Sequence, residues 1–157
     1  MIFGGAAIWG LLLVSCVTTS RTIIAPPSIP GANYVGSNKC AECHEDTATH
    51  FGDATHARLG LKDEKGMDIS CESCHGAGSA HVKAGGSLGT MINPNKSPET
   101  CYSCHLDKRG EFALPNAHPV QGGHVSCSDC HEPHKGKSIA GTGAELVAQN
   151  ENCTRCH

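Results

Sequence analysis

The apolar positions of this chain gather in one run at its start. Residues 1–16 carry no charged side chain, and the run from Ile2 to Val14 has the length of a signal-peptide core but is short for a membrane span. A signal peptide usually begins with Lys or Arg, whereas the first basic residue here is Arg21. We therefore expect a signal peptide at residues 1–16 that is either atypical or preceded by further residues.

The end of this run resembles a bacterial lipobox, the signal at which a cysteine is lipidated and becomes the first residue of the mature protein. Its sequence is LVSC, ending at Cys16. Acyl chains on Cys16 would anchor the protein to a membrane, since each buried methylene contributes about 0.8 kcal/mol. Alternatively, Cys16 is a small apolar residue of a signal peptide that is cleaved elsewhere. Residues 17–33 are rich in Pro, Ser and Thr and predict a flexible linker.

Few positions between residues 34 and 157 follow a sustained helical or alternating apolar pattern. Residues 42–59 predict one or two short helices, and residues 145–155 predict another. Stretches such as GAGSAHVKAGGSLG and INPNKSPE are turn and loop material. We therefore predict a single domain over residues 34–157 that is mostly irregular coil with short α-helices and little or no β-sheet.

The composition makes an ordinary hydrophobic core hard to build. Only 4% of the 157 residues are aromatic, whereas the chain has 11 cysteines, 11 histidines and 19 glycines. Cysteine and histidine in such numbers indicate metal ligands or cross-links. The formal charge is −3 and the sequence has no long Lys/Arg cluster, so nucleic-acid binding is not supported.

Ten of the cysteines fall into five copies of the motif C-x-x-C-H, which start at intervals of 26 to 31 residues. The motifs are Cys40-Cys43-His44, Cys71-Cys74-His75, Cys101-Cys104-His105, Cys127-Cys130-His131 and Cys153-Cys156-His157. In such a motif the two sulfurs can form thioethers with one edge of a porphyrin, while the histidine lies beneath the ring and binds the iron. The sequence therefore predicts five covalently bound haem c groups, which would also form the core of the domain.

Zinc sites and disulfides explain these cysteines less well. Two C-x-x-C pairs can form a closed four-thiolate zinc site, but zinc does not need a histidine after every pair, and five pairs leave one without a partner. A disulfide between cysteines three residues apart would close too small a loop to stabilise the fold. Haem attachment is therefore the preferred interpretation.

Six further histidines are available as second ligands on the far side of each iron. They are His50, His56, His81, His118, His124 and His134. Methionine is the rival ligand, but only Met67 and Met91 lie in the predicted domain. We expect two histidines per iron, with His56, His81, His118, His124 and His134 as the distal ligands. His50 competes with His124 for the last position, and His124 is favoured because it precedes Cys127 by three residues.

Several stretches resemble the multihaem c-type cytochromes of the periplasmic decahaem and pentahaem type. They are YVGSNKCAECHED, SCESCHGAGSAHV, HPVQGGHVSCSDCHEPHKG and the closing ENCTRCH, so that the resemblance covers residues 34–157. It implies a haem-nucleated fold, elongated and loop-rich, that corresponds to one pentahaem unit with closely spaced, low-potential haems. It also implies redox partners, namely a membrane quinol dehydrogenase and a terminal reductase or outer-membrane conduit.

An iron with two protein ligands exchanges electrons but offers no place for a substrate, so we expect an electron carrier and not an enzyme. It would act outside the cytoplasm, in the periplasm, in a respiratory chain ending at a metal, dimethyl sulfoxide or nitrogen-oxide reductase. One alternative is a multihaem reductase with an open iron, but such enzymes often have a C-x-x-C-K motif and this sequence has none. Another is a subunit of an extracellular cytochrome filament, against which a lipid on Cys16 would count.

Overall fold

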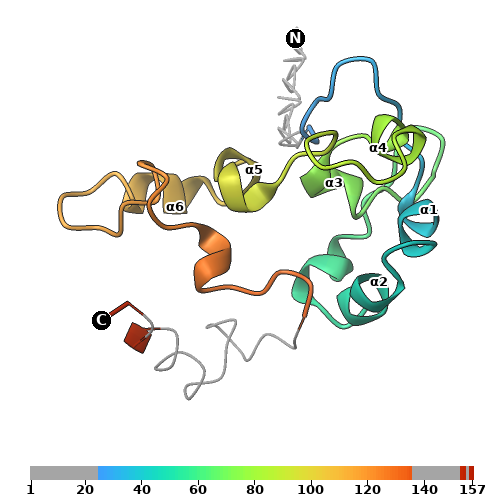
Figure 1. The fold of residues 1–157 in the computed structure, drawn as a ribbon. Helices are drawn as coiled ribbons and strands as arrows, with labels where there is room; N and C mark the ends of the chain where they lie inside the picture. Colours follow the sequence, from blue (N-terminus) through green and yellow to red (C-terminus); the bar gives the residue numbers. More distant parts are fainter. Residues whose placement is uncertain (1–24, 136–152, 155) are drawn as a thin grey trace, which may run out of the picture.

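The computed structural model describes residues 25–135, 153, 154, 156 and 157, so that the predicted signal peptide and Cys16 lie outside the described residues. The described chain forms short helices joined by turns and loops (Figure 1). They are α1 (Ser37–Ala41), α2 (Glu45–Phe51), η1 (Thr55–Leu59), α3 (Glu72–His75), α4 (Ser79–Lys83), η2 (Pro94–Lys96), α5 (Glu99–Tyr102), α6 (Leu106–Glu111) and η3 (Cys127–Asp129). The longest of these, α2, has 7 residues.

The described residues contain no β-strand and have one isolated antiparallel bridge, between Lys62 and Asp68. The prediction of an irregular chain with short helices and little or no sheet is therefore confirmed. The helices predicted within residues 42–59 are α2 and η1. The helix predicted within residues 145–155 falls almost entirely outside the described residues. In the part of the chain that the structure describes, no helix has the length and apolar character needed to cross a membrane.

Two helices end at a glycine with a positive φ. Gly60 follows η1 in the left-handed conformation, with a φ of 51°. Gly76 follows α3 with a φ of 76°, and a Cβ at this position would lie 2.9 Å from the side chain of Ile29 and 3.0 Å from the carbonyl oxygen of Pro27. Glycine is therefore needed at Gly76 both for its φ and for the close approach of the segment that contains Ile29.

The side chains of the described residues form a small core. The buried hydrophobic residues in the described part are Ala54, Ile69, Ala77, Tyr102 and Val120. Larger apolar side chains remain at the surface, among them Leu88, which is 97% exposed. So small a core buries too little apolar area to support a domain of this length by itself. This is what we expect of a fold whose core is completed by bound cofactors.

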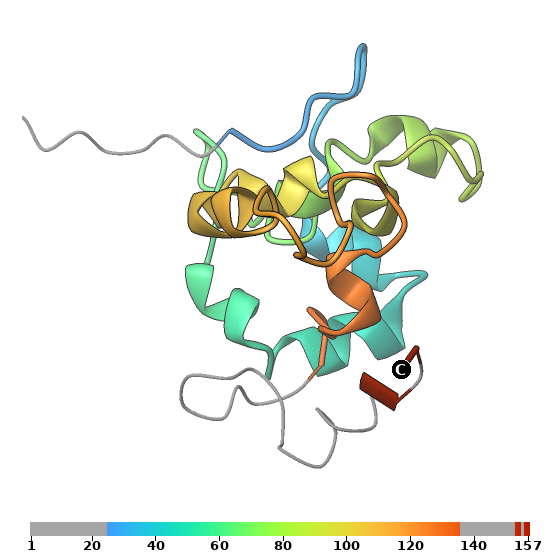
Figure 2. The same cartoon turned by 90° about the vertical axis from the view of Figure 1, so that its left-hand side faces the viewer.

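After α6 the chain turns back on itself. In Figure 1 the chain forms a loop at the left beside α6 and then runs below α5 toward α2, and Figure 2 also shows this return. The Ser128 hydroxyl of η3 donates a hydrogen bond of 2.9 Å to the side-chain oxygen of Asn95 in η2. Further along, the His134 ring lies with its centroid 6.4 Å from that of Phe51 in α2. The return therefore brings residues near the fourth motif against the first half of the chain.

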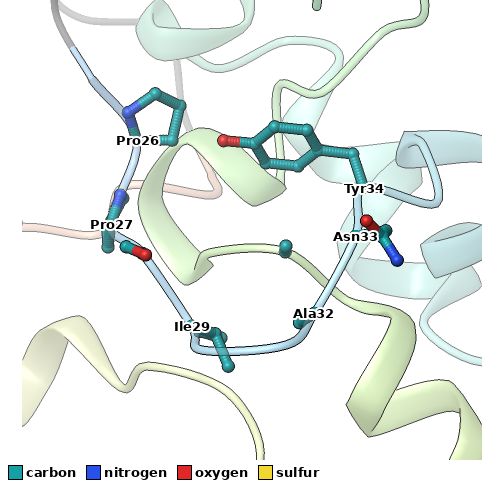
Figure 3. A pocket seen from close by; sticks show the side chains of 8 residues that line it. Pro26, Pro27, Ile29, Ala32, Asn33 and Tyr34 are labelled. Carbon is teal, nitrogen blue, oxygen red and sulfur yellow. The ribbon is translucent and has the colours of Figure 1, made fainter.

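The described end of the predicted linker, residues 25–33, packs on α4. The backbone N–H of Asn33 donates to the Ser79 hydroxyl at 2.8 Å, and the N–H of Ser79 donates to the Asn33 carbonyl at 3.1 Å. A small pocket lies between this segment and Ala77 (Figure 3), and it is also lined by Pro26, Pro27, Ile29, Ala32, Asn33 and Tyr34. The segment is thus joined to α4 just before the first motif.

Candidate haem-binding site

Each of the five C-x-x-C-H motifs forms one tight turn. In all five, the backbone N–H of the motif histidine donates to the carbonyl oxygen of the first cysteine over 2.9 to 3.1 Å. The N–H of the second cysteine donates to the same carbonyl over 3.2 to 3.3 Å. Two thiols and one imidazole are therefore held on a single turn, which is the arrangement that attachment of one porphyrin edge requires.

The motif cysteines are free thiols, and thiols of neighbouring motifs interact. A hydrogen bond between Cys40 and Cys71 raises the pKa of Cys40 and lowers that of Cys71. Burial, with the nearby Cys127 thiol, raises the pKa of Cys101 to about 12. The first cysteines of the first and second motifs are therefore neighbours, as are those of the third and fourth.

Four of the motif histidines each have their ring near the ring of a histidine from elsewhere in the chain. The pairs are His44 with His81, His75 with His134, His105 with His56, and His157 with His118. Their ring centroids are 6.3, 6.0, 6.2 and 6.1 Å apart, in that order. The first two pairs are close to parallel, with angles of 20° and 14° between the rings, whereas the other two are tilted by 86° and 60°.

These separations fit a metal ion between the two rings. A histidine nitrogen bonds a metal at about 2.0 Å and lies about 1.1 Å from the centre of its ring, so imidazoles on opposite sides of one metal have centroids about 6.2 Å apart. The four observed separations span 6.0 to 6.3 Å. No group of three or more His, Cys, Asp or Glu suited to a metal occurs within residues 25–135 and the other described positions. The four pairs therefore have the spacing that two imidazoles on opposite sides of one metal ion would have.

Tyr102, inside the third motif, has a hydroxyl group that lacks a polar partner. Its hydroxyl is buried and has no hydrogen-bond partner among the described residues. Burial also raises the pKa of this hydroxyl, which keeps it a neutral donor. Since buried hydroxyls are normally hydrogen-bonded, a polar atom of a cofactor attached at Cys101 and Cys104 would satisfy it.

Hydrogen bonds at Nδ1 orient two of the paired rings. The Nδ1–H of His75 donates to the carbonyl oxygen of Ile92 over 3.0 Å. Nδ1 of His81 lies 2.9 Å from the hydroxyl oxygen of Thr90, whose own proton is donated to the Ser87 carbonyl. A proton on Nδ1 leaves Nε2 as the nitrogen that can bind a metal. Both rings are therefore in the tautomer that a ligand needs.

The surroundings of two rings also favour the neutral imidazole. Burial lowers the pKa of His75; the hydrogen bond to the Ile92 carbonyl opposes this, and the nearby imidazoles of His134 and His44 lower the pKa further. Burial likewise lowers the pKa of His56, which faces His105. Because only the neutral form binds a metal, both environments favour ligation.

The fourth motif is not paired in this way. Within the described residues, His131 has no ring contact with another histidine. His50 donates from Nδ1 to the Asp46 carbonyl over 2.7 Å, the same kind of bond that orients His75. His124 packs beside Gly122, with its Cδ2 3.2 Å from the place of a Cβ there. The choice of His124 as the fifth distal ligand stays a prediction.

Five single-turn C-x-x-C-H motifs and paired imidazoles spaced for an iron define a multihaem c-type cytochrome. No protein-family model and no solved structure matches the chain. It is similar to the multiheme cytochrome MtrA of Shewanella baltica (strain OS185), with 28% identity over 118 residues that cover 75% of this chain and 31% of that protein.

Two further relatives are cytochrome c-type proteins NrfB. The protein of Haemophilus influenzae is 28% identical over 145 residues, and that of Escherichia coli O6:H1 is 26% identical over 124 residues. Each of these matches covers 75% of this chain and 63% of the relative. The chain thus spans about a third of the length of MtrA and less than two thirds of the length of either NrfB protein.

Proposed function

We propose that this chain transfers electrons through five haem c groups, one attached at each C-x-x-C-H motif. The spacing of the histidine pairs, 6.0 to 6.3 Å between centroids, carries the proposal. The names of the relatives, a multiheme cytochrome and c-type cytochromes, support it. Haem supplies one-electron chemistry when bound, and a histidine on each face leaves no position on the iron for a substrate.

The ring pairs support one distal ligand for each of four motifs. In chain order, His81 serves the first motif, His134 the second, His56 the third and His118 the fifth. For the fourth motif we keep His124, with His50 as its competitor. The thioether cysteines and the proximal histidines are those of the five motifs.

Contacts between motif cysteines support the order in which the haems follow one another. Hydrogen bonds join the thiols of Cys40 and Cys71 and those of Cys101 and Cys127, while Cys74 and Cys104 are near enough to interact electrostatically. Each of these sulfurs bonds the edge of a porphyrin in a c-type cytochrome, so such contacts would bring the edges of successive haems together. Electrons would then pass from motif to motif, from the first to the fourth, in the order of the sequence.

The cellular setting follows from the predicted N-terminal segment. A signal peptide would carry the chain out of the cytoplasm, and a lipid on Cys16 would hold it at a membrane surface. There it would take electrons from a membrane quinol dehydrogenase and pass them to a terminal reductase or an outer-membrane conduit. The relatives are named as cytochromes, which supports redox partners in general.

The full chain, produced in cells that attach haem c, tests the proposal. We expect a mass increase of five haems and five low-spin haem signals in electron paramagnetic resonance during a redox titration. Nitrite and hydroxylamine should leave these signals unchanged. Fewer than five attached haems would contradict the proposed cofactor content. A high-spin signal that shifts with nitrite would indicate an enzyme with an open iron and not an electron carrier.

A further inference from the structure

A glutamate within the second motif is buried more completely than any other polar side chain in the described part of the chain. Glu72 follows Cys71 directly and is 0% exposed. Its Oε1 accepts hydrogen bonds from the backbone N–H groups of Val35 at 2.9 Å and Gly78 at 2.7 Å. Its Oε2 accepts one from the N–H of Gly36 at 2.9 Å. Haem attachment does not require a glutamate at this position.

The hydrogen bonds of Glu72 are those of an ionised carboxylate. Both oxygens accept protons and neither donates one, whereas a neutral acid would have to donate its own proton. Among the described residues, no lysine or arginine forms an ion pair with Glu72. Backbone dipoles alone therefore hold this negative charge inside the protein, where its field is screened less than at the surface.

The charge of Glu72 acts on the attachment points of two haems. The pKa of Cys40 is raised first by its hydrogen bond with Cys71 and by burial, and the charge of Glu72 adds to this. The same charge opposes the hydrogen bond from Cys40 that lowers the pKa of Cys71. Glu72 is thus electrostatically coupled to the first cysteines of both the first and the second motif.

We propose that Glu72 sets the reduction potential of the haems at the first two motifs, making both harder to reduce. A fixed negative charge stabilises the ferric iron, which carries one more positive charge than the ferrous iron, and net charge is one of the factors that set haem potentials. This inference rests on the proposed haem attachment. It gives the chain a built-in difference in potential between its first two haems and the third, whose motif has the uncharged residues Tyr102 and Ser103 between its cysteines.

Glu42 provides a matched control within the same kind of motif. It lies between Cys40 and Cys43, but its side chain is 58% exposed and pairs with Lys39. Water and the lysine screen this charge, so removing it should change the potentials little. Comparing Glu42 with Glu72 therefore shows whether a glutamate between the motif cysteines changes the haem potentials only when it is buried.

The test is a spectroelectrochemical titration of the full haem-loaded chain, of Glu72→Gln and of Glu42→Gln. We expect E72Q to favour reduction of one or two haems about tenfold, which is a rise of about 59 mV for a one-electron couple. The rise should persist in high salt, and E42Q should change reduction less than twofold. Glu72→Asp, which keeps the charge, should stay closer to the parent than E72Q does. Unchanged potentials in an E72Q protein with five low-spin haems, or an equal rise in E72D, would overturn the role of Glu72.

A second measurement covers the case in which E72Q does not assemble. In the parent protein, haem methyl signals followed by nuclear magnetic resonance during reduction should show the haems of the first two motifs reduced after that of the third. Earlier reduction of the first two haems would overturn the proposal. The haem content and low-spin spectrum of the parent test the proposed function separately. A parent protein without five low-spin haems would contradict both proposals. Five low-spin haems with unchanged potentials in E72Q would contradict only the role of Glu72.

Discussion

The rings of His75 and His134 face each other with centroids 6.0 Å apart and planes 14° from parallel, although the third and fourth motifs lie between them in the sequence. If both bind the iron of the second motif, His134→Ala should convert one of the five haems from low spin to high spin. His134→Met should keep that haem low spin and raise its potential, because methionine ligation raises haem potentials.

Electron paramagnetic resonance of the oxidised protein measures both changes. Phe51→Leu is the control, since Phe51 also contacts the His134 ring but carries no ligand atom. Five low-spin haems in His134→Ala would mean that His134 does not ligate an iron.

His124 and His50 are the two candidates for the distal ligand of the fourth motif, and substitutions can distinguish them. We expect His124→Ala to produce one high-spin haem and His50→Ala to leave five low-spin haems. The opposite result would assign the position to His50, whose Nδ1 is already engaged by the Asp46 carbonyl. Low-spin spectra in both variants would place the distal ligand of His131 outside this pair.

Gly76 should resist substitution for steric reasons. Alanine there would have to adopt a φ of 76° and place its Cβ 2.9 Å from the side chain of Ile29. We expect Gly76→Ala to lower the free energy of unfolding by about 2 to 3 kcal/mol, measured by denaturant titration of the haem-loaded protein. Gly66→Ala is the control, with a φ of 82° but no atom within 4 Å of its Cβ, and should cost about 1 kcal/mol. Equal losses in the two variants would show that the contact with Ile29 contributes nothing.

Asp68 should give a pH-dependent contribution to stability. Hydrogen bonds from Ser70, assisted by Ser37 and by the charge of Lys62, hold the pKa of Asp68 below its ordinary value of 3.8. Because the fold favours the ionised form, the stability from Asp68 is present above pH 3.8 and is lost as the pH falls through the lower pKa of the folded protein.

Asp68→Asn should therefore destabilise the protein at pH 6, by less than about 1 kcal/mol because the carboxylate is mostly exposed and screened by water. The difference in unfolding free energy between parent and variant should shrink below pH 3.8. The exposed Asp53→Asn serves as the control. A difference that stays constant from pH 6 to pH 3 would mean that the charge of Asp68 plays no part.

Local sequence patterns predict the parts of this protein that depend on local geometry. The spacing of Cys40, Cys43 and His44 defines a haem motif because all three residues lie on one turn, and residues 42–59 predict helices that the structure contains. The pairing of His56 with His105, or of His118 with His157, depends on how distant loops return. No periodicity or spacing in those loops encodes that return.

The two motif glutamates illustrate the same limit. Glu42 and Glu72 each stand between the two cysteines of a motif, and the sequence around them does not distinguish an exposed carboxylate from a buried one. Burial of Glu72 arises because the backbone of Val35 and Gly36 approaches from before the first motif while Gly78 approaches from after the second. Only the tertiary arrangement brings these three donors together.

The return of residues 114–135 toward α2 has a consequence for how the protein is assembled. A chain is synthesised and exported from its N-terminus, so in the proposed ligation His44 finds its partner once residue 81 has been delivered. His75 of the second motif lacks its partner until residue 134 has been delivered, and by then the third and fourth motifs have already emerged. The histidine pairs would thus become complete in an order different from the order in which their motifs appear. A chain that stopped before residue 134 would contain the histidine pairs of the first and third motifs but not that of the second.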